Sequence, residues 1–285
     1  MHVLKVPYDK GGGAKSLAAK YGPDAIEKQF RKHPWRSSED GRPLEASFVE
    51  IEQKNPKMVS PPNTKAFLDA GERSLVVLSG DNSCTEWTAR GVAEFSSGPH
   101  LAVLDAHLDS CDFSHDPHAS WVRRLWEDGV IRPERTFFFG TRDPEEAEMR
   151  YVKERGATII LADELDRVGP HAIVSNLVLS KKIIAITPLV FAVDIDALDP
   201  VFAPGTGVLR SGGLNIRQVL RLIRAFGELS FPVKVGEISE VIPHEANLWR
   251  PPDDRRPDPS RLTVLAAEVI LREMIHRFSF SKSPA

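Results

Sequence analysis

Six short apolar runs constrain the fold of this chain more than any other feature of its sequence. The runs cover residues 75–78, 101–104, 136–139, 158–161, 189–193 and 233–238 and are rich in Val, Ile, Leu and Phe. They are mostly continuous and do not alternate with polar residues. Continuous runs of this length are typical of strands that are buried on both faces, as in a parallel sheet between helices.

Stretches with helical signals lie between the apolar runs. Several open with proline, a capping cluster or acidic residues, which favour the first turn of a helix. These stretches cover 23–33, 85–95, 144–155, 215–226 and 261–277. The alternation of strands and helices predicts an α/β fold of three layers (αβα) with a mainly parallel central sheet. We expect residues 1–285 to form a single domain of this kind.

The composition excludes several functional classes. Of the 285 residues, 37 are Lys or Arg and 40 are Asp or Glu, which gives a net charge of −3. Nucleic-acid binding usually requires a clear basic excess, so we expect no nucleic-acid partner. No apolar run approaches the roughly 18 residues of a spanning helix, and the N-terminus lacks a signal-like apolar core. The two cysteines suit a reducing compartment, so we expect a cytoplasmic protein without a membrane partner.

Polar side chains follow two of the predicted strands directly. Asp105, His107 and Asp109 come after the run that ends at residue 104, and Asp194 and Asp196 come after the run that ends at 193. Alternate residues of an extended segment share a face. In parallel sheets the ligand site lies beyond the carboxyl ends of the strands. We therefore expect these side chains to converge.

Converging carboxylates remain ionised together only when cations neutralise them. A set rich in carboxylates with an imidazole suits Mn²⁺ or Mg²⁺ better than a structural zinc. Shared carboxylates also allow two ions about 3.5–4 Å apart that activate one water. Either acidic pattern alone is common in turns and caps, but the occurrence of both after buried strands favours a metal site.

Four motifs in order make the chain resemble the ureohydrolase family, which contains the arginases and agmatinases. Its pattern is Gly-Gly-Asp-His-Ser, Asp-Ala-His-x-Asp, Ser-x-Asp-x-Asp-x-x-Asp-Pro with a following Pro-Gly, and Glu-Val-x-Pro. The corresponding segments here are 79–83 (SGDNS), 105–109 (DAHLD), 194–205 (DIDALDPVFAPG) and 240–243 (EVIP). The segment around His118 is similar to the histidine segment of the agmatinase branch. The resemblance implies an arginase-like fold and a divergent, agmatinase-like member.

The resemblance also implies a ligand set for manganese. One ion would be held by Asp105, His107, Asp194 and Asp196. The other would use Asp105, Asp109, Asp194 and the histidine of the first motif, which is Asn82 in this chain. An amide oxygen is a weaker ligand than imidazole for a transition ion, so we expect one or two Mn²⁺ ions with a weak second site. The Thr-Pro-Glu usual after Pro-Gly-Thr-Gly is replaced by 208–210 (VLR).

The implied activity is hydrolysis of a linear guanidino compound to urea and an amine. Glu240 would pair with the guanidinium, and Asp109 would orient the nucleophile and pass a proton to the leaving amine. His118, with His115 as second candidate, would act as proton shuttle or substrate contact. Asp112 is a candidate for a distal amine, although it equally suits a turn.

Three functional hypotheses remain open from the sequence. The first is an agmatinase-like amidinohydrolase. The second is a family member that has lost catalysis and retained the fold and one metal. The third is an amidohydrolase with a single metal, which resembles histone deacetylases; the chain lacks a tyrosine near its later loops, which weakens this hypothesis. The resemblance further implies a homo-oligomer, a trimer or hexamer.

Overall fold

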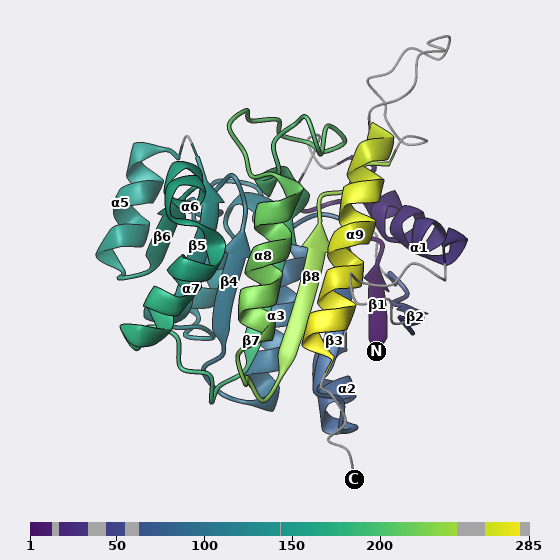
Figure 1. Cartoon of the computed structure of the whole chain (residues 1–285), viewed down its shortest axis with the longest axis horizontal. Coiled ribbons are helices and arrows are strands. Elements are labelled where there is room, and N and C mark those ends of the chain that lie inside the picture. Colours follow the sequence, from purple (N-terminus) through teal and green to yellow (C-terminus); the bar gives the residue numbers. More distant parts are fainter. Residues whose placement is uncertain (13–16, 34–43, 55–62, 143, 244–259, 280–285) are drawn as a thin grey trace.

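The computed structural model describes residues 1–12, 17–33, 44–54, 63–142, 144–243 and 260–279. Within these residues, parallel strands form one eight-stranded sheet in the order β2-β1-β3-β8-β7-β4-β5-β6 (Figure 1). The strands are β1 (His2–Val6), β2 (Ser47–Glu50), β3 (Ser74–Ser79), β4 (His100–Leu104), β5 (Thr136–Thr141), β6 (Thr158–Leu161), β7 (Leu189–Asp194) and β8 (Lys234–Ser239). The predicted parallel sheet is confirmed.

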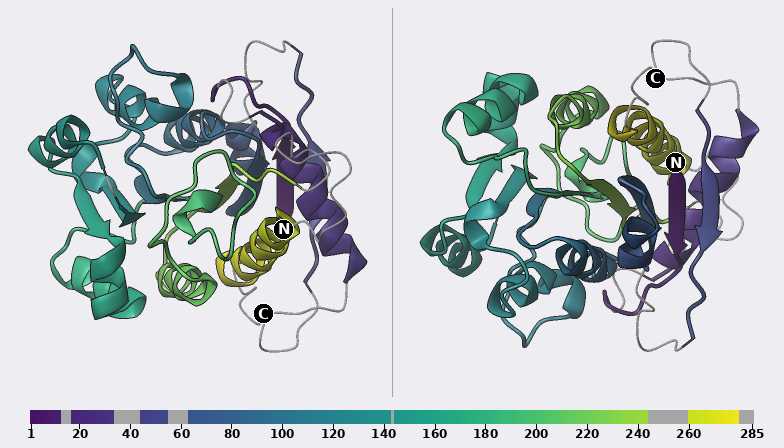
Figure 2. Two further views of the ribbon diagram at one scale, coloured as in Figure 1. Left: turned by 90° about the horizontal axis from the view of Figure 1, so that it is seen from above. Right: turned by 90° about the horizontal axis from the view of Figure 1, so that it is seen from below.

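Helices cover both faces of the sheet, which completes the predicted three layers (Figure 2). One face packs against α1 (Gly22–Lys32), α6 (Ala162–Val168), α7 (Pro170–Leu179), α8 (Ile216–Gly227) and α9 (Ser260–Phe278). The other face packs against α2 (Thr64–Asp69), α3 (Cys84–Phe95), α4 (Trp121–Glu127) and α5 (Glu146–Glu154). Because both faces are covered, the central strands are continuous apolar runs.

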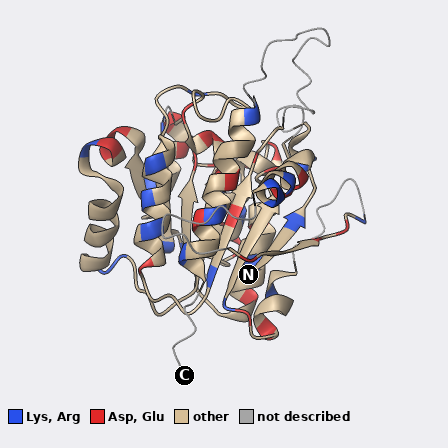
Figure 3. Cartoon of the chain, turned by 45° about the vertical axis from the view of Figure 1, so that its right-hand side comes forward, with Lys and Arg blue, Asp and Glu red and all other residues tan. Residues whose placement is uncertain are grey.

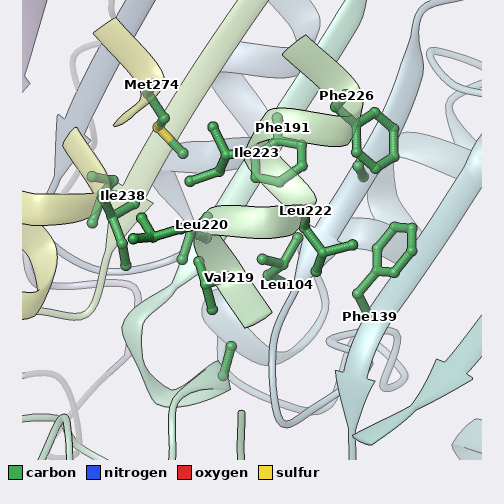
Figure 4. Packing of buried hydrophobic residues seen from close by; sticks show 14 of the residues in the cluster. Leu104, Phe139, Phe191, Val219, Leu220, Leu222, Ile223, Phe226, Ile238 and Met274 are labelled. Carbon is green, nitrogen blue, oxygen red and sulfur yellow. The ribbon is translucent and has the colours of Figure 1, made fainter. Parts of the chain in front are cut away.

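The core beside α8 shows how a helix is seated on the sheet (Figure 4). Phe226 packs edge-on against Phe191 of β7, with ring centroids 5.2 Å apart, and against Phe139 of β5 at 5.7 Å. Asn215 accepts a hydrogen bond from the backbone N of Gln218, whose side chain accepts one from the backbone N of Asn215. This reciprocal cap fixes the start of the helix.

All six predicted strands and all five predicted helical stretches correspond to observed elements. Strands β1 and β2 were not predicted. In β1 the apolar run is interrupted by Lys5, whose ammonium lies 2.7 Å from carboxylate oxygens of both Asp24 and Glu27. Strand β2 lies at the sheet edge and is only partly buried, so it lacks a continuous apolar run. The short helices α2, α4, α6 and α7 were also not predicted.

Charged residues of both signs are interspersed over the helices and loops (Figure 3). This distribution agrees with the near-neutral net charge of the sequence. None of the helices in the described part of the chain has both the length and the apolar character required to cross a lipid bilayer.

Candidate metal centre

Four neighbouring strands position the candidate site at the carboxyl edge of the sheet (Figure 1). Leu104 of β4 pairs with Val193 of β7, so Asp105 and Asp194 follow at the same level of two adjacent strands. Strand β8 is paired with β7 on one side and β3 on the other, and it leads into Glu240. Residues that are far apart in sequence therefore meet because parallel strands end at one edge.

Asp105, His107 and Asp196 form a cluster with metal-ligand geometry. Their ligand atoms all lie within 4.8 Å of one another. The Nδ1 atom of His107 is 3.3 Å from Oδ1 of Asp105 and 3.1 Å from Oδ2 of Asp196. Backbone N–H groups fix the carboxylates: the N of His107 donates to Asp105, and the N of Ala106 donates to Asp196. Carboxylate and imidazole donors fit Mn²⁺.

Asp194 lies beside this cluster and belongs to the same electrostatic unit. Its Oδ1 accepts a 2.8 Å hydrogen bond from the backbone N of Asp196. Burial, together with repulsion from Asp196 and Asp105, raises its pKa well above the usual range. The structure thus brings together the four residues that were predicted to hold one ion.

Burial and the interactions among its members determine the acid–base behaviour of the cluster. Burial and repulsion by Asp196 raise the pKa of Asp105 to about 6. Burial alone would lower the pKa of His107, but its hydrogen bonds to Asp105 and Asp196 raise it to about 11. A protonated imidazole therefore partly neutralises the carboxylates. Cation binding displaces such a proton, since metal ligands must be deprotonated.

Asp109 faces the same space from the loop after β4. Its Oδ2 accepts hydrogen bonds of 2.7 Å each from Nδ2 of Asn82 and from the indole Nε1 of Trp121. Burial and repulsion by Asp105 raise the pKa of Asp109 well above the usual range. Its backbone is left-handed, with a φ of 47°, which is uncommon for a residue other than glycine. Strained backbone of this kind often accompanies functional sites.

Glu240 lines the same cavity as these groups, and its backbone is also left-handed, with a φ of 61°. Its Oε1 accepts a 2.8 Å hydrogen bond from the backbone N of Asn82, and its own backbone N donates to the carbonyl of Gly80. Two strand ends therefore hold this carboxylate in place. Glu240 is 6% exposed, so a pairing with a cationic group would take place with little access to water.

A cavity of about 200 Å³ opens over these groups and is called the site cavity below. Its lining includes His107, Asp109, His115, His118, Asp194, Asp196, Arg210 and Glu240. His118 is partly buried, and its backbone N lies 3.3 Å from the carbonyl of Gly11. The backbone N of Gly11 in turn donates to Asp81 of the first motif. A Cβ at Gly11 would lie 2.1 Å from Oγ of Ser83, so only glycine fits this contact.

His115 and Asp112 lie in an exposed turn at the rim. The ring Nδ1 of His115 is 3.1 Å from Oδ1 of Asp112, which also accepts a hydrogen bond from the backbone N of Ser114. These hydrogen bonds, first of all those of Ser114, lower the pKa of Asp112 to about 2. Among the described residues His115 lines the site cavity, whereas Asp112 serves the turn.

Comparison with known proteins places this site in a family. The family model described as "Arginase family" matches residues 1–275. The chain belongs to the arginase family. The predicted resemblance to ureohydrolases is thereby confirmed, and the arginase-like fold agrees with it.

Relatives of the chain within the arginase family are distant. It is 29% identical over 260 residues to the proclavaminate amidinohydrolase of Streptomyces clavuligerus, covering 85% of this chain and 81% of that protein. It is 27% identical over 290 residues to the agmatinase of Neisseria meningitidis, covering 96% and 85%. A crystal structure of Trypanosoma cruzi formiminoglutamase with Mn²⁺ superposes with a TM-score of 0.76 at 18% identity, covering 96% and 93%, which shows a shared fold.

Asn82 differs from the expectation for this arginase-family position. The motif predicts a weak ligand that offers its amide oxygen. The structure instead directs Nδ2 toward Asp109 and Asp105, while Oδ1 accepts hydrogen bonds from the hydroxyls of Thr85 and Ser239. The hydroxyl donors come from α3 and from β8, so the short sequence motif gives no indication of this orientation.

Two positioning residues of this arginase-family site were not predicted. Nη2 of Arg142 lies 2.7 Å from the carbonyl of Asp196 and 2.8 Å from that of Arg210, so it joins the segment that carries Asp196 to the loop at the cavity rim. Buried Glu148 accepts a 2.6 Å hydrogen bond from the backbone N of Ser110, next to Asp109. Arg142 lies outside the four motifs of the sequence, and the position of Glu148 is typical of an acidic residue in the first turn of a helix.

Proposed function

We propose that this protein is a manganese-dependent, agmatinase-like amidinohydrolase that hydrolyses a linear guanidino compound to urea and an amine. One observation carries the proposal: two members of the carboxylate–imidazole cluster, His107 and Asp196, line a single small cavity together with the buried residue Glu240. Membership of the arginase family supports hydrolysis of C–N bonds in amidines. The agmatinase and proclavaminate amidinohydrolase among its relatives support the substrate class.

The cation would be held by Asp105, His107 and Asp196, with Asp194 beside them. The formiminoglutamase of Trypanosoma cruzi, which shares this fold, has been crystallised with Mn²⁺, and the donor set here suits the same ion. When bound, such an ion supplies the Lewis acidity that makes water nucleophilic at neutral pH.

The remaining chemistry belongs to side chains of the chain itself. Glu240 binds the guanidinium as a bidentate carboxylate, which orients its carbon toward the cluster. Water adds to that carbon, Asp109 accepts a proton from the water, and the proton passes to the leaving nitrogen as the C–N bond breaks. In this proposal His118, which lines the site cavity, shuttles the proton. The products are urea and the free amine.

A second candidate substrate class is a guanidine with a distal carboxylate. Arg210 lines the site cavity, and its backbone carbonyl is held by Arg142. Asp112, the candidate partner for a distal amine, is instead engaged by the turn around Ser114. A carboxylate at the far end of the substrate would find a cationic partner at the rim.

Urea release tests the proposal directly. Protein loaded with Mn²⁺ is offered agmatine, a guanidino carboxylate of matched chain length, and arginine. Turnover of agmatine supports the first candidate; preference for the acid that disappears in Arg210→Gln supports the second. Glu240→Gln should lower kcat/KM by about 100-fold or more, because a buried charge pair loses one partner. Glu154→Gln on α5, which is exposed, is the matched control.

Failure of the folded, Mn²⁺-loaded protein to release urea from any of these compounds would contradict the proposal and favour a member that has lost catalysis. The trimer or hexamer implied by the resemblance stays a prediction, which light scattering on the purified protein checks.

A further inference from the structure

The carboxamide of Asn82 occupies the point at which two acidic side chains of the β4 loop converge. Its Nδ2 is 2.7 Å from Oδ2 of Asp109 and 3.1 Å from Oδ2 of Asp105. All three residues are buried. A neutral amide therefore donates hydrogen bonds to both carboxylates from one position between them.

The surrounding hydroxyl groups fix the orientation of this amide. Oδ1 of Asn82 is 3.0 Å from Oγ1 of Thr85 and 3.1 Å from Oγ of Ser239, and both hydroxyls donate to it. A flipped amide would turn its oxygen toward two carboxylates, which accept hydrogen bonds and repel it. The N–H donors of Asn82 are consequently held toward the carboxylates by groups on both sides of the amide.

Trp121 adds a second neutral donor to the same carboxylate. Its indole Nε1 is 2.7 Å from Oδ2 of Asp109, and the residue is fully buried at the start of α4. A carboxylate oxygen has about two lone-pair sites, and both of those on Oδ2 are occupied by N–H donors from Asn82 and Trp121. This oxygen has no remaining site for a cation.

We propose that the N–H groups of Asn82 and Trp121 replace one cation of the site, so that this chain binds a single divalent ion at Asp105, His107 and Asp196. The inference rests on the metal dependence in the proposed function but not on the substrate. A second ion bound to the Oδ2 atoms of Asp105 and Asp109 would displace the N–H donors of Asn82 and Trp121 from these acceptors, and a buried donor without an acceptor is costly. Asp109 then acts as an acid–base group and not as a ligand.

The metal content of the wild-type protein tests this inference without reference to activity. Protein equilibrated with excess Mn²⁺ and freed of unbound ion is analysed by mass spectrometry for manganese per chain. Its electron paramagnetic resonance spectrum is recorded in parallel. We expect a single ion per chain with the hyperfine pattern of an isolated Mn²⁺. Two ions per chain, or the spectrum of an exchange-coupled pair, would overturn the inference.

The isosteric variant Asn82→Asp sharpens the test. Its side chain keeps an acceptor for the hydroxyls of Thr85 and Ser239 but presents an oxygen in place of Nδ2 to the carboxylates. We expect it to gain a second Mn²⁺ and the spectrum of a coupled pair. Asn215→Asp, the same change at the cap of α8, is the matched control and should retain a single ion. A folded Asn82→Asp protein that still binds a single ion would contradict the proposal.

The contribution of Trp121 to the exclusion of a second ion is measured in the Asn82→Asp variant. Adding Trp121→Phe to Asn82→Asp should tighten the second ion by about 10-fold, because Oδ2 of Asp109 loses an N–H donor that competes with the ion for its lone pairs. Trp126→Phe is the control, because its indole N–H donates to Thr136 away from the site. Equal effects of the two tryptophan changes would show that Trp121 has no role in replacing the ion.

The outcomes also separate this inference from the proposed function. A single ion without urea release from any guanidine refutes the function alone, whereas two ions with turnover refute the inference alone. Absence of any bound ion refutes both. Circular dichroism establishes that each variant is folded, and if Asn82→Asp does not fold, the wild-type count and spectrum decide.

Discussion

Two histidines at the opposite ends of one stretch around β4 have opposite acid–base behaviour. His100 begins the strand and is 1% exposed; burial lowers its pKa to about 4. His107 follows the strand, where hydrogen bonds to Asp105 and Asp196 outweigh burial and raise its pKa to about 11. The side chain of His107 is 30% exposed, and partial exposure alone would not raise a pKa above its ordinary value, so the degree of burial does not account for the opposite shifts.

The neighbours of the two rings account for the difference. The ring of His100 lies 5.7 Å from that of Phe137 and 6.1 Å from that of Phe231, and its Nε2 is 3.0 Å from the backbone N of Ile184. Burial against these apolar rings disfavours the charged form and is the largest cause of the lowered pKa, whereas the hydrogen bond with the backbone of Ile184 raises the pKa and offsets only part of this effect. At the carboxyl edge, two carboxylates favour the charged form. At the amino edge of the sheet the histidine is thus part of an apolar core, whereas at the carboxyl edge it belongs to a charged cluster.

The largest expected effect comes from removing a carboxylate at the carboxyl edge. Asp196→Asn should weaken Mn²⁺ binding by more than about 100-fold, because loss of a group that merely contacts a ligand already costs 10–100-fold. Isothermal titration with Mn²⁺ measures the change. Asp163→Asn on α6, which is exposed, should leave the affinity unaltered. Equal affinity of Asp196→Asn and wild type would remove Asp196 from the ligand set.

An intermediate effect is expected at the amino edge, and it depends on pH. The pKa of His100 is about 4 in the folded protein and about 6.5 when unfolded, so the unfolded chain binds the extra proton between these values. Stability is therefore complete above pH 6.5 and falls by up to about 3 kcal/mol as the pH drops to 4. The variant His100→Gln keeps an acceptor for the backbone N–H of Ile184 but has no imidazole. Its free energy of unfolding should therefore fall less than that of wild type between pH 6.5 and 4.

Denaturant unfolding at a series of pH values measures that difference. His171→Gln, the same change at an exposed position on α7, is the matched control. An unchanged slope in His100→Gln between pH 6.5 and 4 would show that the ring does not titrate as described.

The smallest effect is expected where a histidine and a carboxylate pair without burial. His115 and Asp112 are 3.1 Å apart in an exposed turn, and exposed pairs contribute little. Asp112→Asn should leave the melting temperature unchanged and urea release within about twofold of wild type. A large loss of turnover specific to a substrate with a distal amine would instead assign Asp112 to substrate binding.

The sequence predicts the site better at its centre than at its surroundings. Asp105, His107, Asp194 and Asp196 follow apolar runs directly, and the geometry of a parallel sheet brings such positions together. Trp121 begins a short helix, and no local pattern shows that its indole N–H reaches Asp109. The orientation of Asn82 depends on hydroxyls contributed by α3 and β8, so it requires the tertiary structure.

In the fold, too, the sequence predicts the features that depend on a local pattern and not those that depend on distant residues. Central strands such as β7 are covered on both faces, and their continuous apolar character identifies them. In β1, Lys5 is buried because acidic side chains from α1 and β2 surround its ammonium group. The acidic partners that compensate the charge of Lys5 are distant in the sequence and cannot be recognised from the residues around it. The charged residue interrupts the apolar run, so the hydropathy pattern does not predict this strand.

Arg142 has a consequence for how this protein can change its substrate. Its guanidinium is bonded to carbonyls of the loop that carries Asp196 and of the loop that carries Arg210. The rim and the floor of the site cavity are therefore hydrogen-bonded to the same planar guanidinium group. We therefore expect substitutions that reshape the rim to disturb the position of Asp196 as well, which would link the choice of substrate to the proposed binding of the ion.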